Sequence, residues 1–314
     1  MDVVNATTTR HLGHHDHAHG RPHVTELINE AVSQLAPYAG LILVISLVIF
    51  FLVRYYVFEA FLLRRIYGTT YLNLNSNQRR GFVNHHIAAV AKIIMLSAGA
   101  YPFFAVVAST ATLHTPFAGS KLVTLGDVLT VLNQVFVAMY IFELIYREKL
   151  SYVAVAHHIG TIVIASSAIA ISLDWQHQRD ATLEFILCYV WGVFDVIAEF
   201  WPHVAIILYR MRPTDHNYLR KVFGMAGIVT FSGTVLETVA VMYLWGWAWD
   251  RWTLAFRIVT PILHIIFSCA QLWGAFNFYK MWKKQVQLLR EQKKADVEQP
   301  ATEVLSVTVQ PKMA

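Results

Sequence analysis

Seven long apolar segments constrain this chain more than any other feature of its sequence. A helix needs about 20 mostly apolar residues to cross the hydrocarbon core of a membrane. The segments of that length are 38–58, 83–110, 122–146, 150–172, 182–209, 222–247 and 253–282. Hydrophobic residues make up 56% of the chain and charged residues 14%, whereas an ordinary soluble domain carries about a quarter charged residues. The sequence therefore predicts an all-α integral membrane protein with seven transmembrane helices.

Lys and Arg are unevenly divided between the two sides of this predicted topology. Sixteen of them fall in loops 59–82, 147–149 and 210–221 and in the tail 280–294, and five fall on the other side. Cytoplasmic loops are the ones enriched in Lys and Arg, so we expect a lumenal N-terminus and a cytosolic C-terminus. The net charge of +5 sits beside membrane segments, which indicates lipid headgroups and not nucleic acid as the partner.

Four regions follow from this pattern. Residues 1–37 are predicted to form a His-rich polar lumenal tail, and 38–79 the first transmembrane helix with a basic cytosolic loop. Residues 80–284 form the main membrane domain, and 285–314 a cytosolic, mostly disordered tail. The triplet that starts at Asn5 is an N-glycosylation sequon on the predicted lumenal side, so a glycoprotein is expected.

Many ionisable side chains lie inside the predicted helices. Each costs at least about 2.5–3.5 kcal/mol on insertion scales, which makes each a candidate functional residue. They are His85, His86, Lys92, Glu143, His157, His158, Glu184, Asp195, Glu199, His203, Glu237 and His264. We estimate the depth of each residue in the membrane from its position along its helix. Most of these residues lie between the cytosolic surface and the midplane, so the sequence predicts a polar cavity that opens toward the cytosol.

The fifth segment holds the most informative of these residues. Glu184, Asp195, Glu199 and His203 are separated by 11, 4 and 4 residues, and these intervals return to nearly one face of a helix. A polar stripe of this kind must face the bundle interior. The histidine pair at 157–158 lies at a similar depth, but adjacent side chains point about 100° apart, so both cannot face one partner. The histidine pair could serve only for hydrogen bonding between helices, and this alternative is left open. A structural role is likewise left open for Lys92 and His264.

These residues resemble motifs of the TLC-domain membrane proteins, a family that includes the ceramide synthases. His157-His158-Ile159-Gly160-Thr161 is similar to that family's paired histidines followed by Thr, and Asp195 with Glu199 is similar to the end of its carboxylate motif. The segments around Arg80–His85, Tyr140–Glu143 and Gln271–Lys283 extend the resemblance over roughly residues 80–283. Trp191-Gly192 stands where the ceramide synthase pattern has His-Asp, and Ala168-Ile169 replaces Ser-Tyr, so the chain resembles a divergent member.

The resemblance implies a bundle of helices two to seven with the first helix outside it. It also implies acyl transfer from acyl-CoA to a sphingoid base or a related amine or hydroxyl, in the endoplasmic reticulum. His157 or His158 would be the general base, and Asp195 or Glu199 would orient it. The expected substrate contacts are His203, His85, Glu237 and His264. Acyl-CoA is the expected co-substrate; no cofactor is expected, and a homo- or heterodimer is left open.

Two other functions fit the same residues. A lipid-binding or lipid-transporting protein, or a regulator of membrane lipid composition, would use the polar stripe to hold a headgroup without turnover. A metal-dependent membrane hydrolase would use the His and carboxylate side chains as ligands. The sequence lacks the several spaced His motifs of a hydroxylase, so we expect no metal site.

Overall fold

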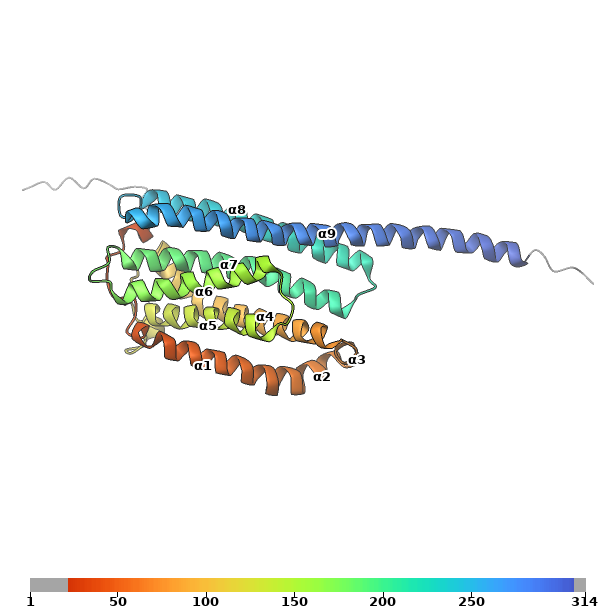
Figure 1. Cartoon of the computed structure of the whole chain (residues 1–314), viewed down its shortest axis with the longest axis horizontal. Coiled ribbons are helices and arrows are strands. Elements are labelled where there is room, and N and C mark those ends of the chain that lie inside the picture. The colour runs from red at the N-terminus through yellow and green to blue at the C-terminus, as the bar shows by residue number, and fades with distance from the viewer. Residues whose placement is uncertain (1–21, 308–314) are drawn as a thin grey trace, which may run out of the picture.

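The computed structural model describes residues 22–307 of the chain. Within them the elements in chain order are η1 (His23–Glu26), η2 (Ala36–Tyr38), α1 (Ala39–Leu52), the π-helix η3 (Val53–Leu62), α2 (Leu63–Tyr67), α3 (Thr69–Leu72), α4 (Ser76–Ala108), η4 (Phe117–Gly119), α5 (Leu125–Tyr146), α6 (Tyr152–Leu173), α7 (Ala181–Met211), α8 (His216–Trp247) and α9 (Leu254–Val307). The described residues contain no strand beyond one isolated bridge between Pro116 and Thr124. Figure 1 shows the helices running side by side along one axis.

Seven helical stretches in the described part are long and apolar enough to span a membrane, which confirms the predicted fold class. They are Ala36–Tyr67, Ser76–Ala108, Leu125–Tyr146, Tyr152–Leu173, Ala181–Met211, His216–Trp247 and Leu254–Ala295. Side-chain caps begin several of them. The side chains of Asn75, Thr124, Ser151 and Asp215 each accept a hydrogen bond from a backbone amide of the first turn that follows. The sequence thus sets both the number of helices and several of their ends.

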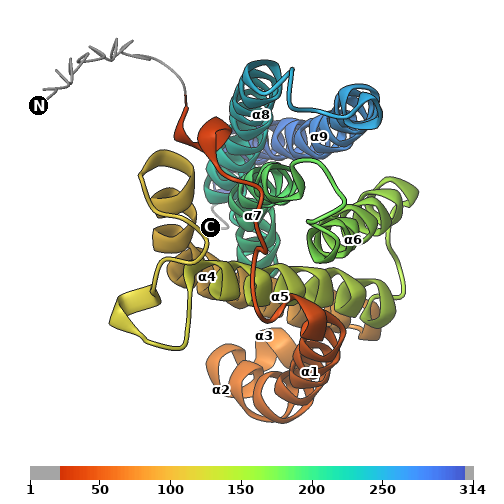
Figure 2. The same cartoon turned by 90° about the vertical axis from the view of Figure 1, so that its left-hand side faces the viewer.

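Helix α7 lies at the centre of the bundle. Viewed from one end in Figure 2, it is surrounded by α4, α5, α6, α8 and α9. Helix α1 lies outside this ring against α5, and all of its apolar side chains except Ala39 are exposed or only partly buried, as suits a helix that faces lipid. The first helix is therefore peripheral, and the polar stripe of α7 is held in the interior.

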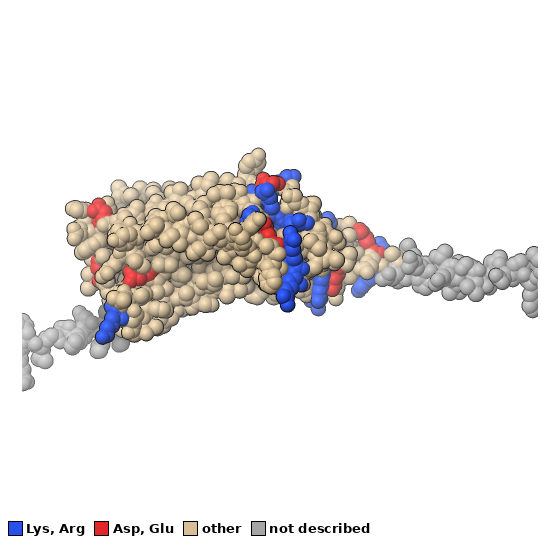
Figure 3. All heavy atoms as spheres, turned by 90° about the horizontal axis from the view of Figure 1, so that it is seen from below, with Lys and Arg blue, Asp and Glu red and all other residues tan. Residues whose placement is uncertain are grey.

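One end of the bundle is rich in Lys and Arg, and we call it the basic end. It is the end at which α4 begins and α5 and α7 finish, and Arg79, Arg80, Arg147, Arg210 and Arg212 lie there. Figure 3 shows most of the Lys and Arg side chains visible in that view gathered in a band near one end of the bundle. The band matches the loops whose charge predicted the cytosolic side.

The opposite end is covered by residues 22–35, which we call the cap. Figure 2 shows this segment crossing the start of α7. Val24, Leu27 and Val32 of the cap are buried, and they belong to the same apolar core as Leu125 and Leu183 at the starts of α5 and α7. Residues 22–35 are thus part of the folded domain, unlike the polar tail predicted over 1–37, because three of their apolar side chains are buried. The sequon at Asn5 lies outside the described residues.

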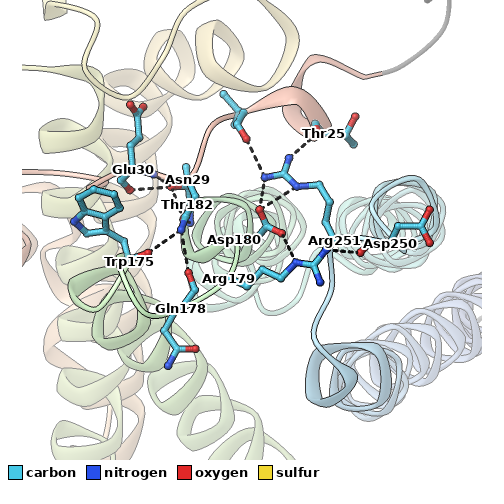
Figure 4. A network of polar contacts seen from close by, with 11 residues as sticks. Thr25, Asn29, Glu30, Trp175, Gln178, Arg179, Asp180, Thr182, Asp250 and Arg251 are labelled. Carbon is cyan, nitrogen blue, oxygen red and sulfur yellow. Dashed lines mark hydrogen bonds and ion pairs between the residues drawn. The ribbon is translucent and has the colours of Figure 1, made fainter.

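Arg251 connects the cap to the neighbouring loops by hydrogen bonds and an ion pair (Figure 4). Its guanidinium donates hydrogen bonds to the backbone carbonyl oxygens of Thr25 at 2.6 Å and Leu27 at 2.9 Å. It also pairs with Asp180 Oδ1 at 2.5 Å, just before α7 begins. One side chain therefore ties together the cap, the loop before α7 and the loop before α9.

A second set of contacts holds the middle of the cap (Figure 4). The amide of Asn29 donates to the carbonyl oxygens of Trp175 at 2.7 Å and Gln178 at 2.9 Å. The hydroxyl of Thr182 accepts from the Glu30 amide and donates to the Glu30 carbonyl oxygen, both at 2.8 Å. These bonds satisfy backbone groups that a tightly packed loop would otherwise leave unpaired.

Helix α9 departs from the sequence prediction at its C-terminal end. A mostly disordered tail was predicted after residue 284, but the helix continues to Val307 and projects past the basic end (Figure 1). Residues 285–295 are rich in Gln, Leu, Arg and Lys, which are good helix formers and favour continuation of the helix.

Candidate functional site

The polar side chains of α7 do not share one environment. Asp195 and Glu199 face His157 of α6, whereas His203 lies against His85 of α4. Glu184 is buried near the capped end, one turn after α7 begins. The predicted stripe is therefore divided among three places along the bundle, and the central one holds the most concentrated chemistry.

His157 lies between the two carboxylates of α7. Its Nε2 atom is 3.1 Å from Glu199 Oε1 and 3.4 Å from Asp195 Oδ1. Neither oxygen lies along the axis of a hydrogen bond from the ring, and the ligand atoms of the three residues fall within 4.8 Å of one another. His157 and Asp195 are both buried. A buried imidazole facing two carboxylates is an arrangement suited to accepting and holding a proton.

Tyr140 and Lys92 engage the other oxygens of these carboxylates. The Tyr140 hydroxyl lies 2.5 Å from Asp195 Oδ2 and 2.8 Å from Glu199 Oε2. Lys92 Nζ donates to Glu199 Oε2 at 3.1 Å, and its side chain is completely buried. Each carboxylate thus has one oxygen held by Tyr140 and the other turned toward His157.

His158 faces a different partner. Its Nε2 atom lies 3.5 Å from Glu143 Oε2, and Glu143 Oε1 pairs with Arg147 at 2.5 Å. The two adjacent histidines of α6 therefore point to different carboxylates, as expected from their angular separation on a helix. The pair of His158 and Glu143 lies nearer the basic end and connects α6 to the last turn of α5.

His85 and His203 form a pair of their own. Their Nδ1 atoms lie 2.8 Å apart, so one ring donates a hydrogen bond to the other. Both residues were predicted as substrate contacts. The structure pairs them with each other, on α4 and α7 toward the basic end, and neither lines the cavity described next.

A cavity of about 120 Å³ lies beside Asp195. Protein cavities of this order can hold a benzene-sized apolar molecule. Along α4 its wall runs from Met95 to Phe104, in the turns farthest from the basic end, and Leu132 and Phe136 of α5 add to it. We predicted a polar cavity that opens toward the basic end. This cavity instead extends away from the basic end and is mostly apolar. The polar side chains toward the basic end are paired with one another and do not line it.

Polar atoms reach the cavity on one side only. Glu237 of α8 and Gln271 of α9 line it together with Asp195 and Thr161. Gln271 Nε2 donates to Glu237 Oε2 at 2.8 Å, while Gln271 Oε1, Thr161 Oγ1 and Asp195 Oδ1 have no hydrogen-bond partner in the described residues. The wall near Asp195 is therefore the polar part of the cavity, with three acceptor atoms buried in it.

His264 supports this wall from behind. Its Nδ1 atom accepts a hydrogen bond from Trp191 Nε1 at 2.9 Å, and its Nε2 atom lies 3.0 Å from Thr238 Oγ1. Glu237 Oε1 is 3.9 Å from the same Nδ1 atom. Of the four predicted substrate contacts, Glu237 lines the cavity and His264 packs next to it.

Sequence reasoning missed Tyr140 and Gln271 and assigned no site role to Lys92. The sequence does hold a signal for Tyr140, which lies three residues before Glu143 and so on the same face of α5. Tyrosine and glutamine are uncharged, and a search for ionisable residues at membrane depth passes over them.

The donor set of His157, Asp195 and Glu199 has the residue types of a metal site. The surroundings fit such a site poorly. A metal-bound histidine normally donates its other N–H to a partner, but Nδ1 of His157 has none in the described residues. A Lys ammonium also contacts one of the two carboxylates.

Comparison of the chain with models of protein families, with curated proteins and with solved structures gave no match. The resemblance to TLC-domain proteins therefore rests on the motif residues themselves.

Proposed function

We propose that this protein transfers a fatty acyl group from acyl-CoA to an amine or hydroxyl group of a membrane lipid, as its resemblance to TLC-domain proteins implies. The observation that carries the proposal is the position of His157, whose Nε2 lies 3.1 and 3.4 Å from two carboxylate oxygens, one of them on Asp195, which lines an apolar cavity. A reaction that joins a lipid tail to a polar acceptor needs an apolar site and a base side by side.

In this mechanism His157 is the general base. It takes the proton from the acceptor amine or hydroxyl, which attacks the thioester carbonyl carbon. The new C–N or C–O bond forms as the C–S bond breaks, and the protonated imidazole returns the proton to the departing thiolate. Asp195 and Glu199 orient the ring and stabilise its cationic form.

The two ends of the bundle match the two parts of acyl-CoA, its apolar acyl chain and its charged coenzyme A. The apolar cavity beyond Asp195 accommodates the part of the acyl chain next to the thioester. The Lys and Arg side chains at the basic end, such as Arg79, Arg80 and Arg147, suit the phosphates of coenzyme A. The thioester would then lie between them, at the level of His157.

The acceptor is a lipid with an amine or hydroxyl close to an apolar chain, such as a sphingoid base. Acceptor oxygens of Asp195, Glu237 and Gln271 in the cavity wall favour a hydrogen-bond donor of this type. We place the protein in the endoplasmic reticulum with the basic end and the C-terminus in the cytosol, where acyl-CoA is made available, and the N-terminus in the lumen.

The direct test uses the purified full chain in liposomes with labelled acyl-CoA and a panel of lipids bearing an amine or a hydroxyl. Acyl transfer releases free coenzyme A and acylated lipid in equal amounts. Lipid that stays bound through purification, with no release of coenzyme A, would instead support the alternative of a lipid-binding or regulatory protein.

A second candidate, a metal-dependent lipid hydrolase, is favoured by one observation. The ligand atoms of His157, Asp195 and Glu199 converge within 4.8 Å without forming in-line hydrogen bonds to one another. Metal analysis of the purified protein separates the two. One divalent ion per chain, lost in the Glu199→Gln variant, would favour hydrolysis over acyl transfer.

A further inference from the structure

One phenol hydroxyl serves two carboxylates in this site. Tyr140 Oη lies within hydrogen-bond distance of both Asp195 Oδ2 and Glu199 Oε2. This contact fixes the terminal side-chain torsion angle of each carboxylate. As a result, Asp195 Oδ1 and Glu199 Oε1 are turned to the same side, toward Nε2 of His157.

Lys92 balances part of the charge of this cluster. Its ammonium is fully buried and lies 3.1 Å from Glu199 Oε2. A fully buried ammonium requires a partner of opposite sign, because water cannot solvate it there. Lys92 compensates one of the two carboxylates, and the remaining negative charge is directed at the His157 ring.

The two nitrogens of His157 differ in their surroundings. Nε2 faces the two carboxylate oxygens, whereas Nδ1 is buried and has no hydrogen-bond partner in the described residues. Nε2 makes no in-line hydrogen bond to these oxygens, so the tautomer is decided by charge: the positive end of an N–H dipole is favoured beside the uncompensated negative charge. Nε2 is therefore the protonated nitrogen, and Nδ1 keeps its lone pair.

We propose that Tyr140 and Lys92 are positioning residues that hold His157 in the Nε2–H tautomer, so that Nδ1 is the nitrogen free to take a proton. The assignment of Nδ1 as the reactive atom rests on the proposed acyl transfer. The tautomer itself depends on the contacts alone, and it can be measured without any substrate.

The first test is ¹⁵N NMR of the purified full chain labelled at histidine. The signals of His157 are identified by their loss in a His157→Gln variant. We expect a protonated Nε2 and an unprotonated Nδ1 in the wild type, and a mixture of tautomers in Tyr140→Phe and in Lys92→Met. A protonated Nδ1 in the wild type, or variants that keep the pure Nε2–H form, would overturn the proposal.

The second test separates positioning from stability. Lys92→Met alone removes the ammonium that balances the partly buried Glu199 charge, which destabilises the fold. In Lys92→Met/Glu199→Gln the charge is removed as well, and the melting temperature should recover. Because one oxygen toward His157 has then lost its charge, kcat should stay about 100-fold below the wild type with KM nearly unchanged. Recovery of kcat together with stability would show that Lys92 is only structural.

Matched substitutions elsewhere control for the change of residue type. Tyr101→Phe alters an exposed tyrosine of α4, and Lys121→Met an exposed lysine in the loop before α5. Both should leave the His157 signals and kcat unchanged. If the wild type transfers no acyl group but shows the Nε2–H form that depends on Tyr140 and Lys92, the proposed function fails and the positioning role stands.

Discussion

The side-chain amide of Gln271 donates a 2.8 Å hydrogen bond to Glu237 Oε2, and both residues lie in the cavity wall with at most 7% of their surface exposed. The bond joins α8 to α9 and leaves Gln271 Oε1 without a partner in the described residues. If the proposed acceptor lipid enters the cavity, this buried carboxylate and the neighbouring amide oxygen are the groups its donor would meet.

Glu237→Gln tests whether Glu237 binds the acceptor lipid. The change keeps the shape of the side chain but removes its charge, so it weakens a charge-assisted hydrogen bond to the acceptor by about 1.5 kcal/mol or more. We expect KM for the acceptor lipid to rise at least about tenfold with kcat little changed, measured by steady-state kinetics. Glu291→Gln, an exposed position on α9, serves as the control. An unchanged KM would contradict a role for Glu237 in binding.

Gly99→Leu tests the tail-binding role of the cavity. A Cβ atom at Gly99 would lie 2.9 Å from Leu132 Cδ1, and both residues line the cavity, so a larger side chain fills it. Long acyl donors should lose at least about tenfold in kcat/KM relative to short ones, since single methylenes in a pocket are worth about 1–3 kcal/mol. Gly274→Leu is the control, because nothing lies within 4 Å of a Cβ there. Equal losses for long and short donors would count against this role.

Arg251→Met tests the attachment of the cap. The substitution removes hydrogen bonds to the Thr25 and Leu27 carbonyl oxygens and the ion pair with Asp180. Because these groups are partly buried, we expect a loss of about 1–3 kcal/mol in the free energy of unfolding, seen as a lower melting temperature in detergent. Arg179→Met, at a largely exposed side chain, should change it by no more than about 0.5 kcal/mol. Equal melting temperatures for the two variants would show that the cap does not depend on Arg251.

The membrane fold could be predicted from the sequence because the length of an apolar segment is a direct physical requirement of the bilayer. That a histidine of the 157–158 pair meets Asp195 or Glu199 could also be anticipated from helical spacing and depth, but which histidine does so could not. The cap could not be predicted, because a segment of this length is too short to span a membrane, and nothing in its pattern shows that Val24, Leu27 and Val32 pack against the ends of the bundle helices.

The remaining differences at the site come from helix rotation. Depth along a helix follows from counting residues, but the direction in which a side chain points depends on how the helices pack. His203 therefore meets His85 instead of His157, although it lies one turn from Glu199. Tyr140 was given no site role for another reason: it is uncharged, and the search for ionisable residues at membrane depth passed over it although it lies on the same face of α5 as Glu143.

The most direct test of the central claim is the acyl-transfer rate of His157→Gln beside that of His158→Gln, each as folded full-length protein in liposomes. His157 faces both carboxylates next to the cavity, whereas His158 is paired with Glu143. Loss of a general base costs about 10²–10⁴-fold in rate, so His157→Gln should fall into that range while His158→Gln keeps at least about a tenth of the wild-type rate. A His157→Gln protein that transfers acyl groups at the wild-type rate would contradict the assignment of His157 as the catalytic base.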